Sequence, residues 1–314
     1  MTKGKICVLA SGGDAPSMNA CIEAIYLNAT ANNLQLYAAI NGYEGLVDNK
    51  VVQVSSFMAR GISGKSGCTF KCGRSKRFLE KDGFASAMAT IKKYAFDAVI
   101  VLGGNGSFNG AGRLKSAGAH ILFIPATIDN DVDYTKNSLG FASAVNCAVR
   151  LVDNLKATME TTSRDFIVQI MGRSCNQLTA RVGTATLADV IDMNGQRHTP
   201  EQIADVFKKN RAMGKESNFA IIQEKIGGDQ TKEMLGGVEL TNQIRKFADD
   251  NNVCFTTLGY LQRGAEPSAY DRFLATLYGD SAVKCVLDKR FGVALSVSND
   301  KVVYIDLPKA PIPS

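Results

Sequence analysis

Three carboxylates follow one short apolar run near the middle of the chain. The run ILFI at residues 121–124 is followed by PATIDND at residues 125–131, which places Asp129 and Asp131 two positions apart, and Asp133 comes next. Carboxylates this close repel one another unless a cation, a shared proton or a hydroxyl group holds them. The stretch therefore predicts either a site that acts on a hydroxyl group or binds a cation, or a turn whose acids cap the next helix.

Two glycine-rich stretches follow other apolar runs and precede expected helices. They are SGGDAPSMN at residues 11–19 and GGNGS at residues 103–107. Glycines let backbone N–H groups approach a phosphate, and the start of a helix adds partial positive charge. Each stretch alone also fits a tight turn, but two at the same end of a sheet predict a polyphosphate site. A carboxylate beside such a site can accept the proton of an attacking hydroxyl group, while another oxygen ligand binds Mg²⁺.

Arginine and glutamate residues lie next to the apolar runs in the second half of the chain. They are Arg164, the motif MGR at residues 171–173, Glu224, and the motif YLQRG at residues 260–264. Arginine binds phosphate through a fork of N–H donors, and a glutamate accepts hydrogen bonds from sugar hydroxyl groups. Together these residues predict a sugar-phosphate pocket, although each alone also fits a surface ion pair.

Two loops carry lysine and glycine residues that resemble phosphate-binding motifs. The stretch KCGRSKR at residues 71–77 has three cations within four residues, so it fits either a triphosphate contact or a solvated basic loop. The stretch GISGKS at residues 61–66 differs from the nucleoside-triphosphatase loop, because Ala59 replaces a required glycine and no buried strand leads into it. We therefore exclude that loop type.

The elements that must position these residues are short apolar runs alternating with amphipathic stretches. The expected strands lie at residues 6–10, 98–102, 121–124, 166–170, 219–222 and 254–258, and the expected helices at residues 20–29, 84–94, 108–116 and 201–210. This alternation predicts an α/β fold with mainly parallel sheets covered by helices. Ligands of such sheets bind beyond the carboxyl ends of the strands, where the polar motifs lie.

The composition narrows the class of partner. The 314 residues are 45% hydrophobic and 21% charged, which is enough for two lobes with their own cores. The net charge of +6 is spread without a long basic run, so we expect small anionic ligands, no nucleic acid and no membrane. The eight cysteines are scattered, and Cys68 and Cys72 lack the second pair that a zinc site needs, which predicts reduced thiols in a cytoplasmic protein.

Six motifs, in order and from end to end, resemble the 6-phosphofructokinase family, specifically its small bacterial-type, ATP-dependent subunits. They are SGGDAPSMNA at residues 11–20, NGYEGL at 41–46, GGNGS at 103–107, PATIDND at 125–131, MGR at 171–173 and LGYLQRG at 258–264. The resemblance implies a two-lobed, phosphofructokinase-like α/β subunit in a homotetramer. It also implies transfer of the γ-phosphoryl group of ATP, with Mg²⁺, to the 1-hydroxyl of fructose 6-phosphate, a reaction of glycolysis.

The resemblance also assigns roles to single residues. The implied catalytic residues are Asp129 as general base, with Arg173, Thr127 and Gly13. The implied metal ligands are Asn105 and Asp129. The implied sugar-phosphate ligands are Asp131, Met171, Gly172, Glu224, Tyr260, Arg263 and, from a neighbouring subunit, Arg164. The implied nucleotide contacts are Gly13, Tyr43, Arg74, Gly104, Gly106 and Ser107.

The resemblance extends to the phosphoryl donor and to the lobes. Gly106 and Ala126 are similar to the ATP-using branch of the family, because pyrophosphate users carry Asp and Lys at these positions. The expected nucleotide-binding lobe contains residues 1–140 plus 254–304. The expected sugar-phosphate-binding lobe contains residues 141–253 plus 305–314, with the sugar phosphate in the cleft between the lobes.

Five positions depart from the family pattern. Asn105 replaces the family's aspartate, which predicts weaker binding of the metal–nucleotide, since an amide lacks the charge a hard cation favours. Cys254 replaces a second arginine from the neighbouring subunit and Tyr260 a histidine, which predicts weaker binding of fructose 6-phosphate or another acceptor. Glu23 and Leu27 replace basic residues of the family's effector site, so we expect no strong effector control.

Two alternatives to the main interpretation therefore stay open. One is a catalytically weak paralogue that binds a nucleotide or sugar phosphate and regulates an active partner subunit. The other is a kinase that uses pyrophosphate as the donor or another ketose phosphate as the acceptor.

Overall fold

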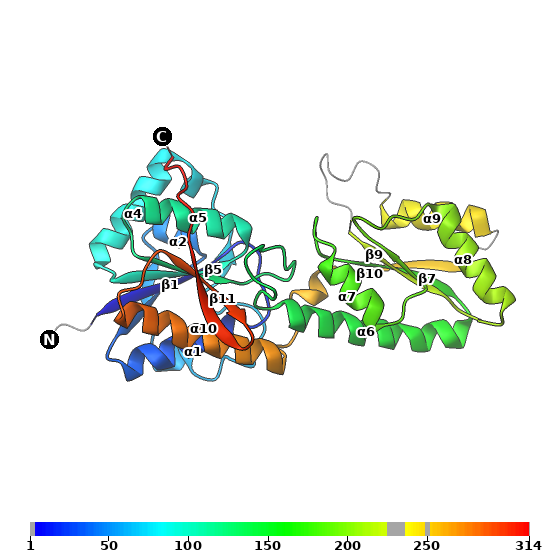
Figure 1. Ribbon diagram of the computed structural model, residues 1–314, viewed down its shortest axis with the longest axis horizontal. Helices are drawn as coiled ribbons and strands as arrows, with labels where there is room; N and C mark the ends of the chain where they lie inside the picture. The colour runs from blue at the N-terminus through cyan, green and yellow to red at the C-terminus, as the bar shows by residue number, and fades with distance from the viewer. Residues whose placement is uncertain (1–3, 225–235, 249–251, 314) are drawn as a thin grey trace. The chain divides into compact units, whose positions relative to one another are not determined.

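The computed structural model describes residues 4–224, 236–248 and 252–313. The chain forms two compact units (Figure 1). Unit 1 comprises Met1–Ser143 and Glu266–Ser314, and unit 2 comprises Ala144–Ala265. Unit 1 is thus built from both ends of the chain, and unit 2 is inserted between them.

Unit 1 is built on an eight-stranded sheet in the order β12-β11-β6-β5-β1-β2-β3, with β4 pairing with β1 beyond the end of β2. The pairs are parallel except β2 with β3 and β11 with β12. The strands are β1 Lys5–Ser11, β2 Gln35–Ala39, β3 Val51–Gln53, β4 Cys72–Gly73, β5 Ala98–Gly103, β6 Ile121–Pro125, β11 Val293–Ser298 and β12 Lys301–Asp306. The central strands β1, β5 and β6 are almost entirely buried, as expected for strands covered on both faces.

Helices cover both faces of this sheet. In Figure 1, α2, α4 and α5 lie on one face and α1 and α10 on the other. Their bounds are α1 Met18–Ala31, α2 Tyr43–Val47, α3 Ser56–Ala59, α4 Lys81–Tyr94, α5 Asn105–Ser116 and α10 Ala269–Leu287, with a 3₁₀ turn at Arg77–Leu79. A Cβ atom at Gly279 of α10 would lie 2.5 Å from the Cβ of Ala24, so the α1–α10 contact requires glycine there.

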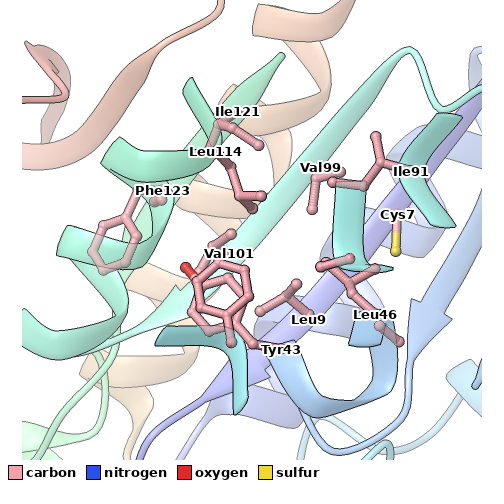
Figure 2. Packing of buried hydrophobic residues seen from close by; sticks show 14 of the residues in the cluster. Cys7, Leu9, Tyr43, Leu46, Ile91, Val99, Val101, Leu114, Ile121 and Phe123 are labelled. Carbon is pink, nitrogen blue, oxygen red and sulfur yellow. The ribbon is translucent and has the colours of Figure 1, made fainter. Parts of the chain in front are cut away.

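One hydrophobic core cluster of unit 1 lies between the sheet and α2, α4 and α5. Figure 2 shows side chains of β1 and β5 packed against those of the helices, among them Cys7, Leu9, Val99, Val101, Leu46, Ile91 and Leu114. Burying this many apolar side chains fixes the positions of the strands, and therefore of the turns that follow them.

Unit 2 contains a parallel four-stranded sheet in the order β10-β7-β9-β8. The strands are β7 Asp165–Ile170, β8 Val190–Asp192, β9 Phe219–Gln223 and β10 Val253–Thr257. The helices are α6 Phe141–Thr162, which begins in unit 1, α7 Gln177–Ala185, α8 Pro200–Ala212 and α9 Gly237–Ala248, with a 3₁₀ turn at Gly259–Gln262. Ile203 and Phe207 of α8 and Leu240 and Ile244 of α9 pack on strand residues such as Ile167. In Figure 1, α8 and α9 lie on one face of this sheet and α6 and α7 on the other.

The expected fold class is confirmed, because each predicted strand and helix is present as an element of an α/β architecture. The bounds of the compact units differ from those of the predicted lobes in three places. Residues 141–143 and 305–314 lie in unit 1, and residues 254–265 lie in unit 2. β10 joins unit 2 because it pairs with β7, and the end of β12 joins unit 1 because β12 pairs with β11. Among the described residues, no helix is both long and apolar enough to cross a bilayer.

Candidate active site

The carboxyl ends of β1, β5 and β6 lie side by side in unit 1. Ser11 is opposite Gly103, and Gly103 is opposite Pro125. The strand order reverses between β1 and β5, since β2 continues on one side and β6 on the other. Such a switch point is where parallel α/β sheets bind ligands. The sheet therefore brings the two glycine-rich turns and the carboxylate stretch together.

The first glycine-rich turn is tied to β4 and to the basic loop. The N–H of Gly12 donates to the carbonyl of Gly73 at 3.0 Å, and Gly12 has a left-handed φ of +92° that favours glycine. Gly13, the next residue, is exposed. Arg74 is also exposed and directly follows Gly73. The first turn therefore presents the backbone of Gly13 with a guanidinium group nearby in the chain.

The second glycine-rich turn begins α5 and is joined to the first turn by Ser107. The Ser107 hydroxyl donates to the carbonyl of Ser11 at 3.0 Å. A Cβ atom at Gly103 would lie 2.6 Å from the same carbonyl, so this close approach requires glycine. Asn105 and Gly106 are exposed at the N-terminus of the twelve-residue α5, where the helix dipole favours an anion.

Tyr43, an expected nucleotide contact, is buried beneath the second turn. Its ring stacks on Phe78 with centroids 4.1 Å apart, and its hydroxyl donates to the carbonyl of Ser107 at 2.7 Å. Burial raises the pKa of Tyr43 well above its usual value. In this structure Tyr43 holds the turn, and its exposed fraction of 4% leaves little surface for a ligand.

The carboxylate stretch forms a loop whose two ends are tied together. The N–H of Leu139 donates to the carbonyl of Pro125 at 2.9 Å, and the hydroxyl of Ser138 donates to the carbonyl of Thr127 at 2.6 Å. The N–H of Asp129 donates to the hydroxyl of Thr127 at 3.2 Å. Thr127 and Asp129 are buried, whereas Asp133 is exposed. The closed loop holds one carboxylate within the protein at the strand ends.

Asn105 and Asp129 were expected to bind a metal ion. The side-chain N–H₂ of Asn105 donates to the carbonyl of Asp131 at 2.8 Å, which orients the amide and leaves Oδ1 as the group that can bind a cation or its water. The described part of the chain contains no group of three or more His, Cys, Asp or Glu residues suited to a metal. These residues fit Mg²⁺, which binds proteins through one or two oxygen ligands and takes the rest from phosphates and water.

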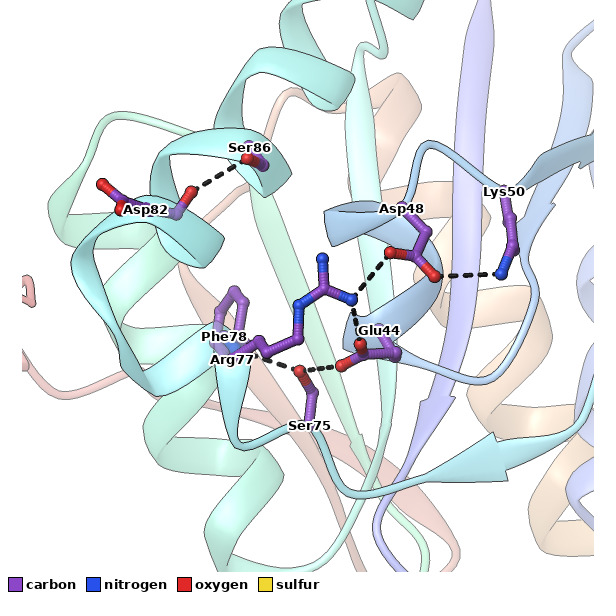
Figure 3. Close-up of polar contacts among 8 residues, drawn as sticks. All are labelled: Glu44, Asp48, Lys50, Ser75, Arg77, Phe78, Asp82 and Ser86. Atoms are coloured by element: carbon purple, nitrogen blue, oxygen red, sulfur yellow. Dashed lines mark hydrogen bonds and ion pairs between the residues drawn. The ribbon is translucent and has the colours of Figure 1, made fainter.

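The arginines of the basic loop at residues 71–77 differ in their contacts. Arg77 forms ion pairs with Glu44 at 2.5 Å and Asp48 at 2.8 Å, and Ser75 also donates to Glu44 (Figure 3). Hydrogen bonds from Arg77 and then Lys50 lower the pKa of Asp48 below its usual value. Arg77 is therefore used to fix α2, which leaves Arg74 as the better placed phosphate contact.

In unit 2, the expected sugar-phosphate residues follow the carboxyl ends of β7 and β9. The carboxylate of Glu224 accepts a hydrogen bond from the N–H of Arg173 at 3.0 Å, and the N–H of Glu224 donates to Ile170 at 2.9 Å. Gly172 has a φ of +137°, and a Cβ atom there would lie 2.9 Å from a carbonyl oxygen. The turn therefore needs glycine at 172, and it leaves the Arg173 side chain exposed.

The third expected motif of unit 2 lies after β10. The buried side chain of Gln262 accepts a hydrogen bond from the N–H of Met171 at 2.9 Å, which ties residues 260–264 to the turn after β7. Tyr260 is 81% exposed and Arg263 is half-buried. Unit 2 thus assembles Met171, Arg173 and Arg263 around one set of strand ends.

Arg164 lies at the opposite end of β7. It directly precedes the strand, whereas Met171 directly follows it, so about 20 Å of strand separates them. Cys254 is paired with Phe166 and lies near the same end as Arg164. Within unit 2, the structure therefore does not bring Arg164 to the other expected sugar-phosphate residues.

Several polar residues that hold the expected site residues of unit 1 and unit 2 in place were not predicted from the sequence. The side chain of Gln223 donates to the carbonyl of Arg173 at 2.5 Å and accepts from the N–H of Asn194 at 2.9 Å. In the carboxylate loop, Asn130 accepts from the N–H of Ser138 at 2.7 Å. Gln223 and Asn130 each adjoin a predicted site residue in sequence, and this adjacency was the available signal.

Comparisons with known proteins show the family of the chain. The family model described as Phosphofructokinase matches residues 5–286. An ATP-dependent 6-phosphofructokinase of Lactobacillus delbrueckii subsp. bulgaricus is 33% identical over 303 residues, covering 96% of this chain and 92% of that protein. The chain belongs to the phosphofructokinase family. Another phosphofructokinase relative, from Clostridium novyi, is 32% identical over 305 residues, covering 97% of this chain and 93% of that protein.

Solved phosphofructokinases have the same fold. The Pichia pastoris phosphofructokinase in the T-state has a TM-score of 0.89 and 30% identity over 98% of this chain. The chain spans 35% of that protein and 45% of the Saccharomyces cerevisiae phosphofructokinase. A pyrophosphate-dependent phosphofructokinase from Marinobacter aquaeolei has a TM-score of 0.83, covers 99% of this chain and 85% of that protein, and is 19% identical, which shows the fold alone.

Proposed function

We propose that the protein is an ATP-dependent 6-phosphofructokinase that converts fructose 6-phosphate to fructose 1,6-bisphosphate in glycolysis. The observation that carries this proposal is the closed loop in which Asp129 is buried, at the strand ends that also bear two linked glycine-rich turns. The relatives named above, which bear the name of this activity, span nearly the same length.

The proposed donor site lies in unit 1. Backbone N–H groups of Gly13, Gly104 and Gly106 would contact the phosphates of ATP, together with Ser107 and Arg74, and Tyr43 would keep the second turn in place. Gly106 has no atom within 4 Å of an added Cβ, so the turn is open to a large donor. Asn105 and Asp129 would hold Mg²⁺, which supplies charge neutralisation on the phosphates.

The proposed chemistry is an in-line transfer. Asp129 accepts the proton of the sugar's 1-hydroxyl group while the oxygen of that hydroxyl group bonds to the γ-phosphorus of ATP. The bond from the γ-phosphorus to the oxygen that bridges it to the β-phosphorus then breaks, which releases ADP. Thr127 and Asp131 would hold the acceptor hydroxyl, while Arg173 and the N–H of Gly13 would stabilise the charge on the moving phosphoryl group.

The proposed acceptor ligands are those of unit 2. Arg263 and Arg173 supply charged N–H donors for phosphate, Glu224 an acceptor for sugar hydroxyl groups, and Met171, Gly172 and Tyr260 the surrounding surface. We propose that Arg164 serves a neighbouring subunit in a homotetramer, because it lies at the far end of β7 from the other ligands.

We also propose a cytoplasmic location. The eight cysteines are present as thiols. Reduced cysteines are the usual state in the cytosol, where glutathione and thioredoxin keep them so.

The experiment that tests the function is a panel of donors and acceptors. Purified protein is assayed with ATP or pyrophosphate against fructose 6-phosphate and other ketose phosphates. We expect turnover with ATP and fructose 6-phosphate to exceed that of every other pair. A preference for pyrophosphate or for another ketose phosphate would contradict the proposal. Turnover with no pair would favour a regulatory paralogue, the alternative that the departures from the family pattern at Asn105 and Cys254 suggest.

A further inference from the structure

Asp271 is a fully buried carboxylate in the first turn of α10. Its Oδ1 accepts a hydrogen bond from the N–H of Gly140 at 3.1 Å. Its Oδ2 accepts from the N–H of Ser143 at 2.7 Å and from the Ser143 hydroxyl at 2.5 Å. Burial raises the pKa of Asp271, against the hydrogen bonds from Ser143, Gly140 and Ser268 that lower it. The carboxylate is therefore held by the start of α6, which none of the reaction steps above explains.

The same contacts tie together the two places where the chain leaves and re-enters unit 1. Ser143 is the last residue of unit 1 before unit 2, and Ser268 follows the return at Glu266. The N–H of Ser268 donates to the Ser143 hydroxyl at 2.9 Å, and the N–H of Asp271 donates to the Ser268 hydroxyl at 3.1 Å. Asp271 and Ser143 are buried and Ser268 is half-buried, and together they form one hydrogen-bonded cluster within unit 1.

This cluster is adjacent in sequence to the loop that carries Asp129. Gly140, bound to Asp271, follows Ser138 and Leu139, the residues that close that loop onto Thr127 and Pro125. A Cβ atom at Gly140 would lie 2.8 Å from the Cβ of Ala15 and from the carbonyl oxygen of Pro16. The backbone at Gly140 therefore also contacts the segment that follows Gly13.

We propose that Asp271 is a positioning residue for phosphoryl transfer. Its carboxylate fixes residues 138–143, and through them it fixes the distance between Asp129 and the first glycine-rich turn. The inference rests on the proposed function, because its effect is measured on that reaction. A misplacement of about 1 Å in reacting groups can lower a rate on the order of 100-fold, so a buried anchor next to the loop has a kinetic consequence.

The first test is Asp271→Asn, which keeps the shape and replaces one acceptor oxygen by an N–H₂ group facing a backbone N–H. We expect kcat per folded protein to fall on the order of 10- to 100-fold. We expect the KM for ATP to change less than kcat, because most of the proposed ATP contacts lie in the second turn, which Ser107 and Tyr43 hold without Asp271. Circular dichroism measures the folded fraction.

A milder variant keeps the test decisive if Asp271→Asn does not fold. Ser143→Ala removes the hydroxyl that joins Asp271 to Ser268 and leaves the backbone N–H in place. We expect a fall in kcat of about 3- to 10-fold, again without a matching change in the KM for ATP. Asp189→Asn is the matched control, since Asp189 is a nearly buried carboxylate that accepts from the N–H of Phe219 in unit 2.

The outcomes separate the two proposals. Loss of kcat in Asp271→Asn and Ser143→Ala, but not in Asp189→Asn, supports the positioning role. Wild-type kcat per folded protein in each of these two variants that folds, or an equal loss in Asp189→Asn, overturns it. Wild-type protein that turns over no donor–acceptor pair overturns the proposed function instead.

Discussion

Replacing the side-chain N–H₂ group of Asn105 by an oxygen atom should directly change the magnesium concentration that the reaction requires. Asn105→Asp adds a carboxylate at the helix start and loses the hydrogen bond to the carbonyl of Asp131. We expect the half-saturating Mg²⁺ concentration to fall, because a hard cation favours a charged ligand, while stability drops by about 1 kcal/mol. Initial rates across a magnesium titration measure the first effect, and thermal unfolding measures the second.

Asn109→Asp provides the matched control for that variant, since Asn109 is an exposed asparagine on the same helix. We expect its magnesium dependence to equal that of the wild type. An unchanged magnesium requirement in Asn105→Asp would refute the metal role of position 105.

At the residue scale, the sequence predicted side chains together with their tasks, and one of these tasks differs in the structure. The roles of Asp129 and Arg173 come from the resemblance of their motifs to the family, since a carboxylate or an arginine after an apolar strand also fits a capping turn or a surface ion pair. The task of Tyr43 depends on Phe78 and Ser107, which are 35 and 64 positions away, so local patterns do not reveal that its ring is buried. The buried anchor Asp271 was missed for the same reason.

At the scale of elements, one face of α1 holds the segment that leads to β4. Glu23 accepts hydrogen bonds from the N–H groups of Gly61, Ile62 and Ser63 at 2.7, 2.9 and 2.7 Å. One turn earlier, Asn19 accepts from the N–H of Thr69 at 2.7 Å. Backbone N–H groups that could bind an anion are thus occupied by a carboxylate of the protein itself.

Glu23 gives a prediction about stability and pH. Partial burial alone would raise the pKa of Glu23, but the hydrogen bonds from Gly61, Ser63 and Ile62 lower it below the usual 4.5. Its ionised form therefore stabilises the protein above pH 4.5, and this contribution is lost as the pH falls through the lowered pKa. We expect Glu23→Gln to cost about 1 kcal/mol at pH 7, a value kept small by exposure to solvent.

Urea unfolding of wild type and Glu23→Gln, from pH 7 to below pH 4.5, measures the difference in their free energies of unfolding. This gap between the two proteins should shrink as the solution is acidified below the usual glutamate pKa. Glu160→Gln, at an exposed position of α6, is the control and should show no such gap. A gap that grows on acidification would show that the assigned hydrogen bonds do not stabilise ionised Glu23.

At the scale of the whole molecule, the alternation of apolar runs was enough to predict an α/β fold with ligands at the strand ends. The sequence did not predict that β10 lies in unit 2, or that the last two residues of β12 lie in unit 1, because an apolar run has the same pattern whichever sheet it joins. Pairing of β10 with β7 and of β12 with β11 decides the boundary, and pairing is not a local property of the sequence.

The proposed role of Arg164 in a neighbouring subunit predicts that subunits share active sites. Arg164→Ala and Asp129→Asn should each have low activity alone, because each would damage every site of the proposed homotetramer. After dissociation and reassembly as a mixture, some sites would combine Asp129 of one subunit with Arg164 of another. We expect partial recovery of activity, measured against mock-treated single variants. A mixture no more active than its components would place Arg164 and Asp129 in the same subunit's site or outside the site.

The most direct measurement of the central claim is kcat for Asp129→Asn with ATP and fructose 6-phosphate. The amide keeps the size of the side chain and removes the base, so we predict a loss on the order of 10²- to 10⁴-fold with the fold intact. Asp133→Asn, at an exposed carboxylate of the same stretch, should keep wild-type kcat. Full-speed phosphorylation by Asp129→Asn would contradict the role of Asp129 as general base.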